Sequence, residues 1–112
     1  MTSQIVVCYG TPTAPQVFDE HYRTKHIPLV GRIPGLSGFT WGKCQSLASG
    51  EPPYYAVAHL NFDTNEALQQ ALVSPQMQDA ARDVREFADG AVTMYICHTE
   101  SVDPGGALQP SR

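Results

Sequence analysis

The fold is decided by residues 54–64, which read Tyr54-Tyr55-Ala56-Val57-Ala58-His59-Leu60-Asn61-Phe62-Asp63-Thr64. This aromatic and apolar run predicts a β-strand over Tyr54–Phe62, which ends at Asp63. Successive side chains of a strand point to opposite faces. One set is Tyr54, Ala56, Ala58 and Leu60, and the other begins with Tyr55 and Val57. Neither set is consistently polar, as a solvated face would be. We therefore expect both sheet faces to be covered, one by helices and the other by a second copy of the chain.

A helix follows this strand, and Thr64 is placed to cap its first turn. Ser74-Pro75 interrupts the helical pattern, and Pro75 suits the first turn of a continuation. Two apolar stripes at helical spacing mark the buried faces. They consist of Ala67, Leu68, Ala71 and Leu72, and then of Met77, Ala80, Ala81, Val84 and Phe87. A last strand is predicted over Ala91–Cys97.

The residues before Tyr54 predict two strands and one helix. Gln4–Tyr9 is a short β-branched run that predicts a buried first strand, and Phe39–Cys44 predicts a second strand near a sheet edge. Between them, Pro15 favours a helix start. We expect this helix to end at Lys25 or His26, because Pro28 disfavours helical geometry at the preceding residue.

The resulting order is βαββαβ, which is the ferredoxin-like α+β pattern. It predicts a four-stranded antiparallel sheet with both helices on one face. Residues 1–100 form this domain, and 101–112 are expected to be a flexible C-terminal tail or an arm that orders against a partner. At 112 residues the chain has the length of a single domain.

Composition excludes several classes of function. The net charge is −4 and the seven Lys and Arg residues are scattered, so we expect no nucleic-acid partner. No apolar run approaches the roughly 20 residues that span a bilayer, and the first residues do not resemble a signal peptide. We therefore expect no membrane association and a cytoplasmic location. Cys8, Cys44 and Cys97 lack pairwise spacing and are interpreted as small buried side chains in a reducing compartment.

The first helix carries the best candidates for chemistry. Phe18, Tyr22 and His26 are spaced i, i+4 and i+8, so they share one face, which Phe18 identifies as the packed one. His26 can act there as a general base while Tyr22 orients a substrate or donates a proton. The alternative is a core histidine bonded to a backbone carbonyl. His21 lies roughly 100° away and is expected to be exposed.

Three further residues are candidates for contacts with a substrate. Phe18 and Trp41 supply aromatic surface, although Trp41 equally suits core or interface packing. His59 can line a cavity, bond across a dimer or pair with a strand neighbour. His98 is expected at the surface.

Several signatures of other chemistry are missing from the sequence. His21 and His26 are five residues apart, which is not the spacing of a helical metal-binding pair, and no other ligand cluster is present. No nucleotide-binding glycine motif, Walker motif or GxSxG elbow is found. We therefore expect neither a metal site nor a cofactor.

The pattern Phe18-x-x-His21-Tyr22-x-x-x-His26-x-Pro28-Leu29-Val30 resembles the EthD family of dimeric α+β barrel proteins. The turn Ile33-Pro34-Gly35-Leu36 and the junction Phe62–Leu68 are also similar to that family. The resemblance implies a ferredoxin-like homodimer with facing sheets and a pocket between sheet and helices. His26 matches the family's His-x-Pro-Leu histidine. The family is named for a role in ethyl tert-butyl ether degradation, and related barrels include cofactor-free monooxygenases, cyclases, dehydratases and isomerases.

Two functions follow as hypotheses. The first is a cofactor-independent enzyme of oxygenase, cyclase, dehydratase or isomerase type that acts on a small apolar or aromatic compound in catabolism or secondary metabolism. The second is a non-catalytic accessory or small-molecule-binding protein that supports an oxygenase system. The absence of a convergent set of acid and base groups beyond His26 and Tyr22 favours the second.

Overall fold

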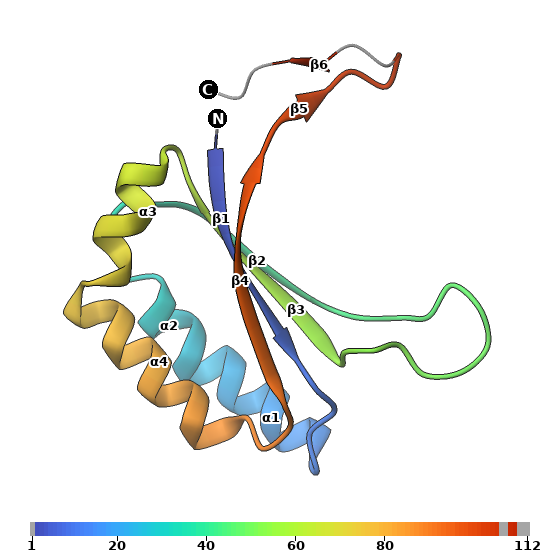
Figure 1. The fold of residues 1–112 in the computed structure, drawn as a ribbon. Coiled ribbons are helices and arrows are strands. Elements are labelled where there is room, and N and C mark those ends of the chain that lie inside the picture. Colours follow the sequence, from blue (N-terminus) through green and yellow to red (C-terminus); the bar gives the residue numbers. More distant parts are fainter. Residues whose placement is uncertain (1, 106–107, 110–112) are drawn as a thin grey trace.

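The computed structural model describes residues 2–105 and 108–109, and it consists of one sheet with helices on a single face (Figure 1). The sheet has the strand order β2-β3-β1-β4, and all pairings are antiparallel. These strands are β1 (Thr2–Tyr9), β2 (Leu36–Lys43), β3 (Ala56–Phe62) and β4 (Val92–Thr99). The predicted ferredoxin-like α+β fold is confirmed, and β2 lies at an edge as expected.

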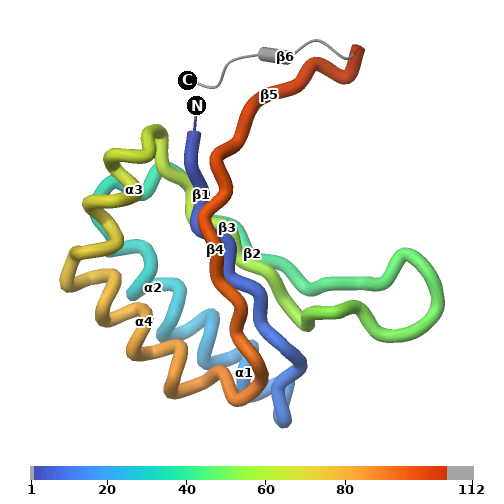
Figure 2. The backbone as a smooth tube through the Cα atoms, viewed as in Figure 1, coloured from blue at the N-terminus to red at the C-terminus, as the bar shows by residue number. Residues whose placement is uncertain are grey.

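The helices form a second layer against this sheet, as the backbone trace also shows (Figure 2). The first helical segment comprises α1 (Pro15–His21), a π-helical turn η1 (Tyr22–His26) and α2 (Ile27–Val30). The second comprises α3 (Asn65–Leu72) and α4 (Pro75–Phe87).

The first helical segment runs to Val30, so the predicted end at Lys25 or His26 was wrong. In η1 the N–H of Ile27 donates to the carbonyl of Tyr22, five residues back. Pro28 then lies in the first turn of α2, where its missing N–H removes no α-helical hydrogen bond. The π turn thus lets the chain pass the proline without leaving the helix.

The predicted breaks in the second helical segment are confirmed. The Thr64 hydroxyl accepts a hydrogen bond from the N–H of Ala67, and the Ser74 hydroxyl accepts one from the N–H of Met77, each at 3.1 Å. Pro75 occupies the start of α4. The Thr64 cap fixes where α3 begins, and the Ser74 cap fixes where α4 begins and so which residues of α4 face the sheet.

All four strands differ in their bounds from the predictions. β1 begins at Thr2 instead of Gln4, and β4 covers Val92–Thr99 instead of Ala91–Cys97. β2 begins at Leu36 instead of Phe39, because Gly35 turns the chain with φ +79°. β3 begins at Ala56 instead of Tyr54, and the segment between β2 and β3 projects from the domain (Figure 1). Cys44 therefore follows β2 and is partly exposed, whereas Cys8 is buried in β1.

The core lies between the sheet and the helices. The central strand β1 contributes Ile5, Val7 and Tyr9, and α4 contributes Ala80 and Val84. An aromatic group joins the layers at one end of the core, with ring centroids 5.1–6.0 Å apart. Its members are Tyr9, Phe18, Tyr22 and Phe87.

The opposite sheet face carries no helix in the described part of the chain (Figure 1). Register places Thr40, His59, Val6 and Tyr95 in one row across its four strands. At the β4 end of this row, Tyr95 is 51% exposed to solvent. In the neighbouring row the Asn61 side-chain oxygen is buried and has no hydrogen-bond partner among the described residues. This face therefore mixes apolar and polar groups, of which Val6 and Cys8 are buried and Tyr95 is exposed, and no helix of the described chain covers it.

The C-terminal region forms a local hairpin, in which β5 (Ser101–Val102) pairs antiparallel with β6 (Leu108–Gln109). It extends away from the main sheet beyond β4 (Figure 1). The sequence did not predict this pairing. The rest of the predicted tail, 106–107 and 110–112, lies outside the described residues, and ordering against a partner stays a prediction.

Candidate functional site

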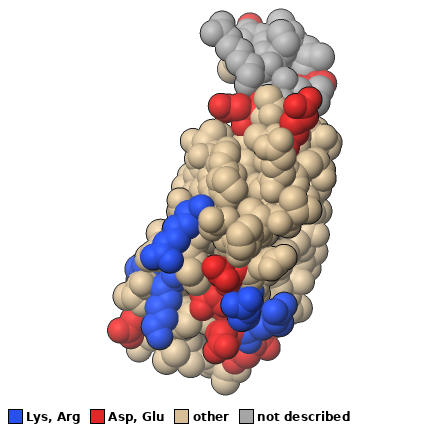
Figure 3. All heavy atoms as spheres, turned by 90° about the vertical axis from the view of Figure 1, so that its left-hand side faces the viewer, with Lys and Arg blue, Asp and Glu red and all other residues tan. Residues whose placement is uncertain are grey.

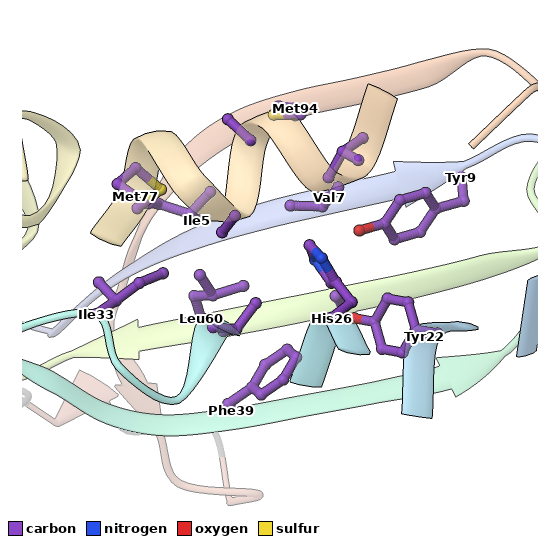
Figure 4. A pocket seen from close by; sticks show the side chains of 15 residues that line it. Ile5, Val7, Tyr9, Tyr22, His26, Ile33, Phe39, Leu60, Met77 and Met94 are labelled. Carbon is purple, nitrogen blue, oxygen red and sulfur yellow. The ribbon is translucent and has the colours of Figure 1, made fainter. Parts of the chain in front are cut away.

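A cavity of about 60 Å³ lies between the sheet and the helices, beside the aromatic group. Its lining is apolar except for Tyr9, Tyr22 and His26. Figure 4 shows the ring of His26 and the hydroxyls of the two tyrosines pointing toward the same part of this cavity. Two methionines, Met77 and Met94, lie farther along the wall.

Tyr22 is fully buried, and its hydroxyl has no hydrogen-bond partner among the described residues. Its ring lies 6.0 Å from that of Phe18 and 4.1 Å from the indole of Trp41, measured between centroids. Burial raises the pKa of Tyr22 well above its ordinary value of 10.0, and the neighbouring Tyr9 side chain partly opposes this effect. The side chain is therefore a neutral phenol at physiological pH and retains an O–H donor for an acceptor in the cavity.

Tyr9 is the second phenol of the cavity, and the sequence analysis did not single it out. It ends β1 on the face toward the helices, with its ring 5.8 Å from that of Tyr22. Burial, followed by the proximity of Tyr22 and Asp83, raises the pKa of Tyr9 far above 10.0. Its position in the apolar run was the only signal, and that pattern does not distinguish a core tyrosine from a site tyrosine.

His26 reaches the cavity from the end of η1, with 4% of its side chain exposed. Its Nδ1 lies 2.9 Å from Oδ2 of Asp83. Because an ionised carboxylate only accepts hydrogen bonds, Nδ1 carries the proton and Nε2 is the free basic nitrogen. Burial lowers the pKa of His26 below 6.5, and the hydrogen bond to Asp83 partly opposes this effect. His26 is therefore a neutral imidazole with an available base.

Asp83, like Tyr9, belongs to this site although it was not predicted from the sequence. It lies on α4 with 11% of its side chain exposed and also accepts from Nε2 of His21, at 2.8 Å to Oδ1. A signal existed, because Asp83 lies three residues after Ala80 and four before Phe87, on the flank of the predicted apolar stripe. An acidic residue at such a position requires a polar partner across the helix interface.

His21 is only 22% exposed in its side chain, so the expectation that it is exposed was wrong. It stacks on Phe87, with 5.0 Å between ring centroids, and shares Asp83 with His26. The physical reason is the π turn, in which each hydrogen bond joins residues five apart. This wider turn brings His21 and His26 toward the same side of the helix, where both reach Asp83.

A surface groove of about 340 Å³ runs past His21 on the outer side of the helices. Charges of both signs line it, from Lys25, Asp79, Arg82, Asp83 and Glu86. Figure 3 shows that charged side chains of both signs gather on this helical side of the molecule. The His21–Asp83–His26 series therefore extends from this groove to the buried cavity.

The other predicted site residues lie at different distances from the cavity. Phe18 is buried and Trp41 is partly buried, and both contact the Tyr22 ring without lining the cavity. The Arg23 and Lys43 cations each lie 5.7 Å from the Trp41 ring. His59 lies on the uncovered sheet face, where it pairs with Val6, and so is separated from the cavity by the sheet. The structure thus brings Tyr22 and His26 together, supports them with Phe18 and Trp41, and leaves His59 apart.

His98, at the end of β4, is exposed as expected, and its Nδ1 lies 2.8 Å from the Ser3 hydroxyl. Within residues 2–105 and 108–109, no group of three or more His, Cys, Asp or Glu residues has an arrangement that could hold a metal ion. None of the helices in the same part of the chain has the length and apolarity needed to cross a bilayer.

Comparison with known proteins gives a family match over most of the chain. Residues 11–91 match the family model of the EthD domain. A Rhodococcus erythropolis protein, described as an uncharacterized 11.0 kDa protein in the thcB-thcC intergenic region, is 45% identical over 101 residues. That alignment covers 90% of this chain and 98% of the relative.

Solved structures show the same fold. An ethyl tert-butyl ether degradation (EthD) family protein of Bacillus halodurans is 30% identical with a TM-score of 0.82, covering 88% of this chain and 99% of that one. A dimeric ferredoxin-like protein of unknown function from Thermobifida fusca is 16% identical (TM-score 0.67; coverage 88% and 92%). SnoaB, a cofactor-independent oxygenase from Streptomyces nogalater, is also 16% identical (TM-score 0.64; coverage 92% and 97%). The last two matches show the fold alone.

Proposed function

Since this chain belongs to the EthD domain family, we propose that its cavity takes up a small, neutral, oxygen-bearing compound of apolar or aromatic character and moves a proton on it without a cofactor. The observation that carries this proposal is the pairing of a free imidazole nitrogen on His26 with an unpartnered phenol on Tyr22 in one apolar cavity.

The cavity favours neutral ligands. Tyr9, Tyr22 and His26 are all neutral near pH 7, so nothing in the lining offers a counter-charge to an anion. The charge nearest to His26 is the Asp83 carboxylate, which repels anions. At about 60 Å³ the cavity is much smaller than the roughly 300–1,000 Å³ of drug-sized ligand sites. The ligand is therefore small, and the flexible side chains of Met77 and Met94 allow the wall to adjust to it.

The roles of the two residues follow from their hydrogen-bonding capacity. The Tyr22 O–H donates to a carbonyl or phenolic oxygen of the ligand, which satisfies a buried donor that otherwise has no partner. Nε2 of His26 takes a proton from the ligand, and Asp83 stabilises the imidazolium that forms. Contacts with Phe18 and Trp41 hold the Tyr22 ring in place.

Oxygenation, cyclisation, dehydration and isomerisation without a cofactor all depend on such a proton transfer. SnoaB, which has the same fold, is described as a cofactor-independent oxygenase, and this supports the reaction class without identifying the reaction. A place in small-molecule catabolism or secondary metabolism, in the cytoplasm, belongs to the same proposal.

We further propose that the protein is a homodimer whose uncovered sheet faces pack together. In the row that contains Val6, His59 and Tyr95, Val6 is buried, whereas Tyr95 is 51% exposed and offers aromatic surface that no helix covers. The Thermobifida fusca protein of the same fold is described as dimeric. In such a dimer His59 contacts the partner and not a ligand in the cavity.

Exchange of α-protons tests the proton-transfer function without knowledge of the natural substrate. Small ketones from acetone upward are incubated with the protein in D₂O, and loss of the α-proton signal is followed by NMR. Wild-type protein is expected to accelerate exchange for at least one ketone. Tyr55→Phe, which removes a tyrosine hydroxyl outside the cavity, serves as a control and is expected to exchange at the wild-type rate. If ketones and phenols bind but no exchange exceeds the buffer rate, the accessory, ligand-binding function replaces the enzymatic one.

A further inference from the structure

Asp83 joins the two histidines of the helical layer through separate oxygens. Its Oδ2 accepts from Nδ1 of His26 at 2.9 Å, and its Oδ1 accepts from Nε2 of His21 at 2.8 Å. Both distances are those of charge-assisted hydrogen bonds. One carboxylate therefore determines which nitrogen carries the proton in each ring.

The two histidines lie in different environments. His26 is 4% exposed in its side chain and faces the cavity, whereas His21 is 22% exposed and lines the groove that runs past Lys25 and Asp79. Water and ions in the groove therefore contact His21 without reaching His26. The carboxylate between the two rings connects the groove with the cavity.

We propose that Asp83 is a positioning residue that fixes Nε2 of His26 as the base of the cavity. We also propose that its second oxygen couples this base to His21, so that a proton gained by His21 in the groove makes His26 a weaker base. This proposal rests on the proposed function for its catalytic consequence only. The coupling itself is a property of the ligand-free protein.

The direction of the coupling follows from charge. When His21 gains a proton on Nδ1 from water, the positive charge lies beside the carboxylate and competes with His26 for it. The pKa of His26 is lowered mainly by burial, raised by Asp83 and lowered further by His21. Loss of Asp83 is thus expected to lower the pKa of His26, and loss of His21 is expected to raise it.

Other ionisable groups also face this series, and the test has to account for them. Lys25 of η1 and three residues of α4 line the groove with His21, and Glu20 of α1 lines a second surface hollow that also contains His21 and Lys25. The two cavity tyrosines line the same cavity as His26. The three residues of α4 are Asp79, Arg82 and Glu86. Arg82 forms an ion pair with Asp79 at 3.4 Å, and no hydrogen bond joins it to either histidine in the described chain. It therefore provides a control in the same groove.

Asp83→Asn is an informative substitution because an amide has one accepting oxygen and one donating nitrogen. It can accept from only one histidine, so the other ring has to change its tautomer or lose the bond. His21→Gln removes the titrating ring and keeps an N–H donor for Asp83. The control Arg82→Gln changes the groove charge without touching the carboxylate.

Long-range ¹H–¹⁵N NMR spectra of the histidine rings report both tautomer and pKa for each variant. The expected wild-type state is Nδ1–H for His26 and Nε2–H for His21, retained in Arg82→Gln. In Asp83→Asn at least one tautomer is expected to change and the pKa of His26 to fall. In His21→Gln the pKa of His26 is expected to rise, by roughly half a pH unit or more for removal of a neighbouring charge.

The proposal is overturned if Asp83→Asn leaves both tautomers and the pKa of His26 unchanged, or if His21→Gln does not raise that pKa. A fold check by the amide spectrum accompanies each variant, and Asp83→Glu replaces Asp83→Asn if the latter is unfolded. Asp83→Glu is expected to preserve both tautomers, and a change of both would contradict the proposal. Since these measurements need no ligand, their failure is distinguishable from an absence of ketone exchange, which concerns the proposed function.

Discussion

The indole of Trp41 lies 4.1 Å from the phenol ring of Tyr22, measured between ring centroids. Trp41 is the only tryptophan of the chain, so tryptophan fluorescence reports on the surroundings of this one indole, which include Tyr22. It lies behind Tyr22 as seen from the cavity and is not part of the lining.

Ligand binding is therefore expected to change the emission of Trp41 in a saturable way, because a hydrogen bond to the Tyr22 hydroxyl alters the ring against which the indole packs. Titration with small phenols and ketones measures this change. In Tyr22→Phe we expect affinity to fall roughly tenfold, which corresponds to about 1.4 kcal/mol. Equal affinity in both proteins would show that the hydroxyl does not contact the ligand.

The unpartnered hydroxyl also predicts an unusual effect on stability. Removal of a buried polar group that has no partner costs little, so Tyr22→Phe is expected to be as stable as wild type or up to about 1 kcal/mol more stable. Tyr55→Phe removes a hydroxyl that donates to Asp19 at 2.9 Å and is expected to lose about 1–2 kcal/mol. Urea unfolding of the two variants measures both values, and a marked loss in Tyr22→Phe would indicate a structural role for its hydroxyl.

The lowered pKa of His26 predicts a pH-dependent stability. The unfolded chain binds a proton at this histidine as pH falls below 6.5, whereas the folded chain resists it. Above pH 6.5 His26 is neutral in both states, so its protonation does not lower the free energy of unfolding. As pH falls from 6.5 toward the folded-state pKa of His26, the free energy of unfolding declines by at most about 1.4 kcal/mol per pH unit. Thermal or urea unfolding between pH 7.5 and 5 measures this decline.

In His26→Gln the decline over this pH range is expected to be shallower than in wild type. His98→Gln, a change at an exposed histidine on β4, is expected to follow the wild-type curve. Parallel curves for wild type and His26→Gln would mean that His26 takes up a proton equally well in the folded and unfolded states.

The uncovered sheet face predicts a dimer that a single charge disrupts. Tyr95 lies on this face in the row of Val6 and His59, so Tyr95→Glu is expected to weaken association by at least tenfold. Val73→Glu places the same charge at an exposed position between α3 and α4 and is expected to leave association unchanged. Size-exclusion chromatography with light scattering measures the masses, and a wild-type monomer at micromolar concentration would contradict the dimer.

Much of the fold could be predicted from the sequence because its determinants are local. The apolar runs of β1 and β3, the caps at Thr64 and Ser74 and the break at Pro75 each depend on a few neighbouring residues. The π turn could not be predicted, because it depends on how the segment before Pro28 packs against α4. From the sequence alone, Pro28 indicates a helix end, because the residue before a proline disfavours helical backbone angles.

The candidate site could be predicted only in part, for a related reason. Tyr22 and His26 share a helix face and therefore a recognisable spacing. Asp83 is distant in sequence from both histidines, and its role depends on the packing of two helices. Which sheet face His59 occupies depends on how β3 pairs with its neighbours. The sequence of β3 alone does not determine this, because apolar residues occur on both of its faces.

The central claim is that His26 moves a proton on a ligand in the cavity, and α-proton exchange in D₂O tests it most directly. The comparison is between wild type and His26→Gln, for the ketone that exchanges fastest, with folding verified for both. A general base contributes roughly 10²–10⁴-fold, so His26→Gln is expected to reduce the exchange rate at least 100-fold. An unchanged rate in His26→Gln, or a wild-type rate equal to that of buffer, would contradict the claim.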